Sequence, residues 1–229
     1  MAAMSAISID ITTKTYPAQP GSPAREVFRG FRLDVARGAF LALLGPSGLG
    51  KTTLLNIVAG LDADYRGSVR FDPPQPRIAY AFQNPRLLPW RSVLDNVALV
   101  LPAGASGRAA AQHMLEEVEI GELAGAFPER LSLGQQRRVA LARAFALEPD
   151  ILLMDEPFTS LDEATARRLR DLLRRLLARR PATVMFVTHD SREAAELASR
   201  VIRLEGAPVR IASDEPGSPL SSSPPQAQA

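Results

Sequence analysis

Apolar runs and alternating stretches divide the chain into the strands that we expect. Three continuous apolar runs predict strands that are buried on both faces, as in a parallel sheet. They lie within residues 39–44, 150–156 and 183–187. Alternation of apolar and polar residues at 7–12 and 31–35 instead predicts antiparallel strands with one buried face. Shorter strands are expected at 69–71, 78–82 and 201–204. The pattern predicts an α/β core with an antiparallel β subdomain beside it.

The interval from 84 to about 147 changes to a helical character. Apolar residues recur there at helical spacing, among them Val97, Leu115 and Val118, while 102–107 resembles a loop. No long strand signal falls in this interval. We therefore expect a helical subdomain inserted between strands of the core.

A later helix is expected to have one apolar and one basic face. Its apolar positions are Leu169, Leu172, Leu173, Leu176 and Leu177. Its arginines are Arg167, Arg168, Arg170, Arg174 and Arg175. We interpret these arginines as a solvated face rather than a nucleic-acid patch.

Composition narrows the class of protein. The chain has 229 residues, 46% of them hydrophobic, which suits one α/β domain with a small insertion. The net charge is only +2, so nothing demands a nucleic-acid partner, and without cysteine there is no disulfide framework. The sequence contains no run of about 18 apolar residues, so we expect no membrane span and a cytoplasmic protein. We place one domain at 1–213 and a disordered tail, rich in Pro and Ser, at 214–229.

One glycine-rich stretch matches the phosphate-binding pattern G-x-x-x-x-G-K-[ST]. It reads Gly45, Pro46, Ser47, Gly48, Leu49, Gly50, Lys51, Thr52, Thr53. An expected strand precedes it and a helical pattern follows, so backbone N–H groups and a helix N-terminus would face the phosphates. Lys51 would reach the β- and γ-phosphates and the Thr52 hydroxyl would hold Mg²⁺. The stretch predicts a nucleoside-triphosphate site.

Two adjacent carboxylates, Asp155 and Glu156, end the second buried run. One can hold Mg²⁺ and the next can orient or deprotonate an attacking water. Two acids after a strand are equally compatible with the start of a helix. The pair alone leaves both readings open.

Ser132 and Gln135 have the spacing of a capping box and predict a helix that runs through Phe145. An ordinary capped helix explains them. A helix N-terminus that aims the Ser132 hydroxyl and the Gly134 N–H at phosphate explains them as well.

Together these stretches resemble the ATP-binding-cassette (ABC) ATPases, the P-loop NTPase motors of ABC transporters. The family signature Leu-Ser-Gly-Gly-Gln appears as residues 131–135, with Leu133 in place of the first glycine. Further motifs follow in family order: Gln83 as the Q-loop, Asp162 in the D-loop, and His189 as the switch histidine. Tyr16 fits the aromatic residue that stacks on adenine. The resemblance covers about residues 5–212.

The resemblance implies a mechanism. Two copies would face head to tail as a homodimer and sandwich two ATP molecules between the phosphate loop of one copy and Ser132, Gly134 and Gln135 of the other. Glu156 would polarise the water, and His189 would contact the γ-phosphate side. Gln83 would sense Mg²⁺ and water, so Thr52, Gln83 and Asp155 are the expected metal-site residues. We expect function to survive Leu133, because the phosphate-facing groups belong to Ser132 and Gly134.

The resemblance also implies a place in the cell and partners. The chain would lie at the cytoplasmic face of the membrane, bound to permease subunits, with a substrate-binding protein as an optional partner. Residues 85–99 resemble the ATPases of nitrate, aliphatic sulfonate and taurine importers, and Trp90 would belong to an exposed docking patch. The alternatives are a soluble ABC-type ATPase acting on nucleic acid and a regulatory module without turnover. The first needs a second cassette or a long coiled coil, and the second is disfavoured by the presence of Lys51, Glu156 and His189.

Overall fold

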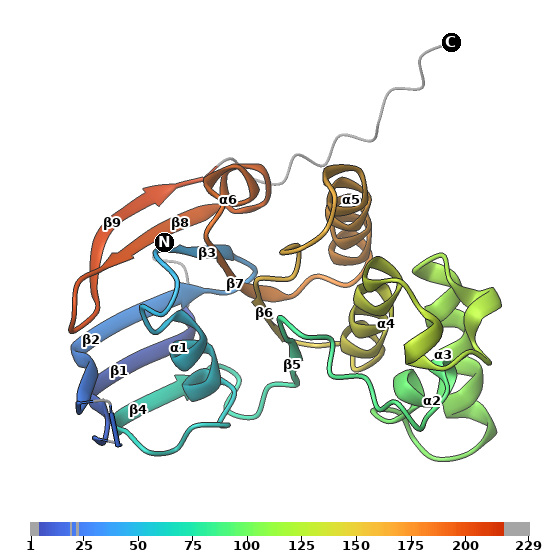
Figure 1. Ribbon diagram of the computed structural model, residues 1–229, viewed down its shortest axis with the longest axis horizontal. Coiled ribbons are helices and arrows are strands. Elements are labelled where there is room, and N and C mark those ends of the chain that lie inside the picture. The colour runs from blue at the N-terminus through green and yellow to red at the C-terminus, as the bar shows by residue number, and fades with distance from the viewer. Residues whose placement is uncertain (1–4, 19, 22, 218–229) are drawn as a thin grey trace, which may run out of the picture.

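Two β-sheets organise the chain (Figure 1). The structure is a computed structural model that describes residues 5–18, 20–21 and 23–217. One sheet has three strands in the order β2-β1-β4, and the other has six in the order β5-β6-β7-β3-β8-β9. The predicted α/β class with a separate antiparallel sheet is confirmed.

The smaller sheet is antiparallel throughout. Its strands are β1 (Ser5–Tyr16), β2 (Arg25–Ala36) and β4 (Arg66–Phe71). Ile7, Ile9 and Ile11 are buried, as their alternation with polar residues predicts. The Tyr16 end of β1 pairs with the start of β2 at Arg25, so these two residues are cross-strand neighbours.

The larger sheet is parallel except at one edge. Its strands are β3 (Phe40–Leu44), β5 (Ile78–Ala81), β6 (Ile151–Asp155), β7 (Thr183–Thr188), β8 (Arg200–Glu205) and β9 (Arg210–Pro216). Every residue of β3, β6 and β7 is buried, which explains their unbroken apolar runs. β9 pairs antiparallel with β8. Its mostly exposed, polar residues give no strong strand signal, so the sequence pattern does not predict it.

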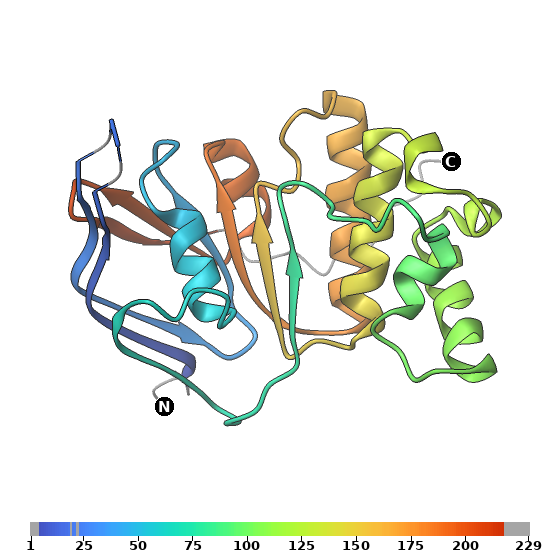
Figure 2. The same ribbon diagram turned by 60° about the horizontal axis from the view of Figure 1, so that its bottom comes forward.

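Two hydrophobic cores lie on opposite faces of the larger sheet. Along β3, Leu41 and Leu43 face the core shared with the antiparallel sheet, while Phe40, Ala42 and Leu44 face the other. Helix α1 (Lys51–Val58) contributes to the first core, and Figure 2 shows it between the two sheets. This position fixes the start of α1 at the carboxyl end of β3.

Helices cover the second core. They are α2 (Val93–Ala98), α3 (Ala105–Glu117), α4 (Leu133–Ala146), α5 (Glu163–Arg179) and α6 (Ser191–Leu197), with 3₁₀ turns at Gly121–Leu123 and Pro128–Arg130. The loop predicted at 102–107 is wrong for its last three residues, because α3 begins at Ala105. Gly107 is a buried helical residue whose backbone approaches the Pro102 carbonyl, so it allows close packing rather than a turn.

Helix α5 has the predicted apolar face, but one arginine departs from the expected basic face. Arg170 is only 6% exposed, and its guanidinium contacts Glu163 and Glu196. The prediction that Arg170 is solvated is wrong. Helical spacing places it near the edge of the apolar stripe, and at such a position the contacts with other segments decide whether the side chain is exposed.

The predicted start of the tail at Asp214 is wrong for residues 214–216, which belong to β9. Asp214 accepts hydrogen bonds from Nε and Nη2 of Arg200, at 2.8 and 2.7 Å. The rest of the predicted tail, from 218 onward, lies outside the described residues. Within the part of the chain that the structure describes, no helix is long and apolar enough to cross a membrane.

Candidate functional site

The glycine-rich loop connects β3 to α1, as predicted, and its glycines adopt backbone angles that other residues rarely take. Gly48 and Gly50 have φ angles of 75° and 123°. At Gly50 a Cβ atom would also lie 2.5 Å from Cγ1 of Val27, so both space and conformation require glycine. Val27 therefore packs against the loop and helps to fix its path.

Lys51 is the first residue of α1 and is almost fully buried. Its ammonium donates hydrogen bonds to the carbonyl oxygens of Gly45, at 2.6 Å, and Pro46, at 2.8 Å. Burial lowers the pKa of Lys51, while the charges of Glu156 and Asp155 oppose that shift. The loop thus holds a largely buried ammonium group, whose charge is favoured by the two carboxylates that follow β6.

Thr52 and Asp155 bring the loop and the end of β6 together. The Thr52 hydroxyl donates to Oδ2 of Asp155 at 2.9 Å. Burial raises the pKa of Asp155, and the hydrogen bond from Thr52 acts against that rise. A hydroxyl and a carboxylate oxygen in contact are the hard ligands that Mg²⁺ prefers, so these residues fit a magnesium site.

Glu156 follows β6 in a strained conformation, with a φ of 43°. Its backbone N–H donates to the carbonyl oxygen of Val187, on β7, at 2.9 Å. Its side chain accepts a hydrogen bond from the Thr159 hydroxyl at 3.1 Å, and its Oε2 lies 3.2 Å from Nδ1 of His189. No helix begins at the Asp155–Glu156 pair, which removes the helix-start reading.

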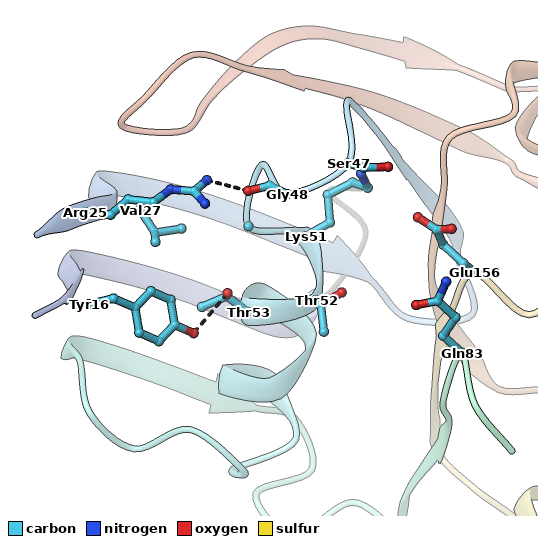
Figure 3. Close-up of a pocket in the computed structure, with 11 residues that line it drawn as sticks. Tyr16, Arg25, Val27, Ser47, Gly48, Lys51, Thr52, Thr53, Gln83 and Glu156 are labelled. Carbon is cyan, nitrogen blue, oxygen red and sulfur yellow. Dashed lines mark hydrogen bonds between the residues drawn. The ribbon is translucent and has the colours of Figure 1, made fainter. Parts of the chain in front are cut away.

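A cavity of about 290 Å³ joins most of these groups. Figure 3 shows Lys51 and Thr52 on one side and Gln83 and Glu156 on the other. The predicted loop residues that line it are Ser47, Gly48, Gly50, Lys51, Thr52 and Thr53. Gly45, Pro46 and Leu49 do not line it: the first two accept from Lys51, and Leu49 packs on the core beneath.

Tyr16 lies at the far end of the same cavity and is 41% exposed. Its hydroxyl lies 3.2 Å from Oγ1 of Thr53. The buried Lys14 ammonium lies 4.6 Å from the centre of the Tyr16 ring and is paired with Asp62 at 2.8 Å. These contacts orient a partly exposed aromatic ring beside the phosphate loop.

Arg25 also lines the cavity, although no sequence motif predicts it as a site residue. Its guanidinium donates to the carbonyl oxygen of Gly48, and Figure 3 shows it reaching toward the loop above Val27. Arg25 and Lys51 are the two cations that line this cavity. The signal that could have found Arg25 is its cross-strand position opposite Tyr16 in the hairpin of β1 and β2.

The remaining predicted site residues lie outside this cavity. Ser132 and Gln135 form the predicted capping box, with Ser132 N donating to Gln135 Oε1 at 2.9 Å and Gln135 N donating to Ser132 Oγ at 3.3 Å. Gly134 packs against Thr165 of α5. Asp162 caps α5 by accepting from Thr165 N at 2.9 Å. One copy of the chain therefore does not bring these residues to the phosphate loop.

The chain resembles known proteins in both sequence and structure. The family model described as "ABC transporter" matches residues 28–159. Aliphatic sulfonates import ATP-binding protein SsuB 2 of Mesorhizobium japonicum is 48% identical over 184 residues, which cover 79% of this chain and 72% of that protein. The corresponding SsuB 1 of Streptomyces avermitilis is 46% identical over 204 residues, covering 89% and 75%.

Solved structures agree with the sequence comparison. The dimeric post-hydrolysis state of the ATP-binding cassette MJ0796, bound to ADP and Pi, matches with a TM-score of 0.80 and 31% identity, covering 92% of this chain and 98% of that one. A dimeric structure of the same bacterial ABC transporter cassette also matches with a TM-score of 0.80, at 32% identity. The chain thus shares its fold with these cassettes over most of its length.

Proposed function

The chain belongs to the ABC transporter family of ATPases, and we propose that it powers the import of an aliphatic sulfonate or a similar small anion. It is an ATPase, and it would act with a separate membrane permease. The observation that carries the proposal is the convergence of Lys51, Thr52 and Glu156 on one cavity. The similarity to sulfonate import subunits supports transport over a role on nucleic acid.

The phosphate loop would bind the triphosphate through its N–H groups and Lys51. The Lys51 ammonium, held by two loop carbonyls, would turn to the β- and γ-phosphates, which offer a stronger, charged acceptor. Tyr16 would stack on adenine at the other end of the cavity. Arg25 would add positive charge between Lys51 and Tyr16.

Thr52, Asp155 and Gln83 would hold Mg²⁺ at the end of β6. When bound there, Mg²⁺ would supply positive charge that offsets the negative charge of the triphosphate. Asp155 must be ionised to bind a cation, and the Thr52 hydrogen bond favours the ionised carboxylate. Gln83 lines the cavity beside Glu156 and would orient the water together with it.

Glu156 would accept a proton from the attacking water, and His189 would contact the γ-phosphate side of the transition state. The strained backbone and three separate contacts hold Glu156 in one place. Such positioning, rather than covalent chemistry, supplies most of the catalysis of phosphoryl transfer.

A second copy would complete the site. Ser132, Gly134 and Gln135 stand at the N-terminus of α4, and Asp162 at that of α5, outside the cavity of their own chain. A head-to-tail dimer would bring them to the γ-phosphate of the partner's ATP. The dimeric cassettes among the similar structures support this arrangement.

The chain would be a peripheral protein at the cytoplasmic face of the membrane, with a substrate-binding protein as a further partner of the complete importer. Trp90 is 72% exposed, which supports a docking role for the segment around it. Residues 84–147, with α2, α3 and α4, would form the helical subdomain on which the permease docks, within one ATPase domain.

Transport is tested with the chain and the permease subunits that co-purify with it, reconstituted in vesicles. ATP-dependent uptake of labelled ethanesulfonate is expected with the parent chain and not with Glu156→Gln. Uptake of nitrate but not ethanesulfonate would reject the sulfonate assignment and retain the transporter. ATP hydrolysis without any co-purifying permease or uptake would reject transport.

A further inference from the structure

Arg170 is a buried cation that no motif accounts for. Its side chain is 7% exposed, and it projects from the middle of α5. Nη2 donates to Oε1 of Glu163 at 2.9 Å, and Nε lies 2.8 Å from Oε2 of Glu196. A buried guanidinium requires partners to offset its lost hydration. Here one partner lies at the start of α5 and the other lies on α6.

The first partner belongs to the segment that carries Asp162. Glu163 is the first residue of α5 and directly follows Asp162, the residue that caps this helix. The Arg170 side chain therefore reaches back along α5 to its N-terminus. A displacement of the Arg170 side chain would therefore break or move its contact with Glu163, next to Asp162.

The second partner belongs to the segment that carries His189. Glu196 lies in α6, which begins at Ser191, two residues after His189. Arg174, one turn further along α5, donates to Oε1 of Glu196 at 2.8 Å and to its carbonyl oxygen at 3.1 Å. Two arginines of α5 thus hold α6 against the body of the domain.

A third contact involves the segment that carries Glu156. The Arg170 guanidinium lies 5.9 Å from the centre of the Phe158 ring, within the range of a cation–π contact. Phe158 is buried two residues after Glu156 and packs edge-on against Phe186 of β7, at 5.8 Å. One side chain therefore contacts the segments after β6 and after β7, and the start of α5.

The turn at His189 is itself closed by hydrogen bonds. The Thr188 hydroxyl donates to Oε2 of Glu193 at 2.5 Å and accepts from the N–H of Asp190 at 3.0 Å. Glu193 lies on α6, one turn before Glu196. The position of α6, which Arg170 and Arg174 hold, thus sets where the backbone of His189 lies.

From these contacts we propose that Arg170 is a positioning residue for ATP hydrolysis, which holds the segment of His189 in place against the segments of Asp162 and Glu156. This inference rests on the proposed roles of Glu156 and His189. Arg170 itself does not line the cavity that holds Lys51 and Glu156. Its effect passes through Glu196 and α6 to His189.

The test replaces Arg170 with methionine, which keeps the volume of the side chain and removes both ion pairs. Because displaced catalytic groups cost rate rather than ground-state affinity, we expect kcat to fall about 10-fold and KM for ATP to stay within about twofold. Arg170→Lys, which keeps the charge and cannot span both glutamates, should restore part of the rate. Arg167→Gln is the matched control, because Arg167 is exposed and its Nη2 lies 3.9 Å from Glu163 Oε1 without reaching Glu196.

A double-mutant cycle separates positioning from a general loss of structure. If Arg170 acts through His189, Arg170→Met should lower kcat little further in the His189→Ala background. The inference would be overturned if Arg170→Met lowered kcat by the same factor in the His189→Ala background as in the parent. An unchanged kcat of Arg170→Met, or a lower melting temperature as its only effect, would overturn it as well. Glu196→Gln, at a half-exposed position, should give the same pattern and carries the test if Arg170→Met does not fold.

Failure of the positioning role of Arg170 and failure of the proposed function give different results. Absence of ATP hydrolysis by the folded parent chain and by Arg167→Gln, with and without the permease, would reject the proposed function. Full hydrolysis by Arg170→Met would reject the positioning role alone.

Discussion

Nδ1 of His189 lies 3.2 Å from Oε2 of Glu156, although 33 residues separate the two in the chain. They follow β7 and β6, which are parallel neighbours with Asp155 opposite Val187. Parallel neighbours end at the same edge of a sheet, so the residues that follow them meet. The pairing brings together the two residues for which we propose the roles of general base and switch histidine.

Glu156→Gln keeps the shape and hydrogen bonding of the side chain and removes its basicity. We expect the variant to bind ATP and to lose nearly all turnover, because glutamine cannot accept the proton of the attacking water. ATP should then accumulate a nucleotide-loaded dimer, since the γ-phosphate contacts persist. Light scattering with and without Mg-ATP, over a wide range of protein concentration, measures this. Hydrolysis at the parent's rate would rule out Glu156 as the base.

Lys51→Ala removes the buried ammonium of the phosphate loop. ATP affinity should be lost, because the triphosphate loses its main counter-charge within the cavity. Calorimetric titration with ATP measures the affinity, and circular dichroism checks that the variant is folded. Near-parental affinity in a folded variant would contradict the assignment of the loop.

Arg25→Gln tests the cation that lines the cavity at the start of β2. We expect ATP affinity to fall by about 5- to 30-fold, the loss of one charge-assisted hydrogen bond worth roughly 1–2 kcal/mol. Arg29→Gln is the matched control, because Arg29 lies on the same strand and pairs with Glu26 outside the cavity. Equal affinities of the two variants would show that Arg25 only tethers Gly48.

Two truncations test the end of the domain. A chain that ends at Gly217 should melt near the parent's temperature, whereas one that ends at Ser213 should melt lower, because it loses three residues of β9 and the Arg200–Asp214 pair. The hydrogen bond from Arg200 lowers the pKa of Asp214, so this pair stabilises the fold at neutral pH and its contribution is lost as the pH falls through that lowered value.

The difference between the two melting temperatures should therefore narrow on acidification. Both side chains of the pair are partly exposed, so the narrowing is expected to be small. Thermal scans from neutral pH to below the ordinary range of aspartate measure it. Equal melting temperatures at neutral pH would mean that the last residues of β9 contribute nothing to stability.

The sequence by itself determined features that depend on nearby residues. The buried strands β3, β6 and β7 were visible as apolar runs, and the capping box of Ser132 and Gln135 was visible because its two members are three residues apart. The glycine-rich loop between β3 and α1 was predicted in the same way, because its glycines and the flanking strand and helix patterns lie within one short stretch. In each case the residues that form the sequence pattern are the same residues that form the structural element.

Only the tertiary structure decided which distant residues meet. The contact of Thr52 with Asp155 spans 103 residues and follows from the packing of α1 against the sheet. Arg25 reaches the cavity because the β1–β2 hairpin pairs it with Tyr16. Arg170 is buried where Glu196 of α6 and the Phe158 ring contact its guanidinium. Periodicity reports which face of an element is apolar, but it carries no information about which neighbour covers a boundary position. That choice is made by the order of strands in the sheet and by the helices packed on it.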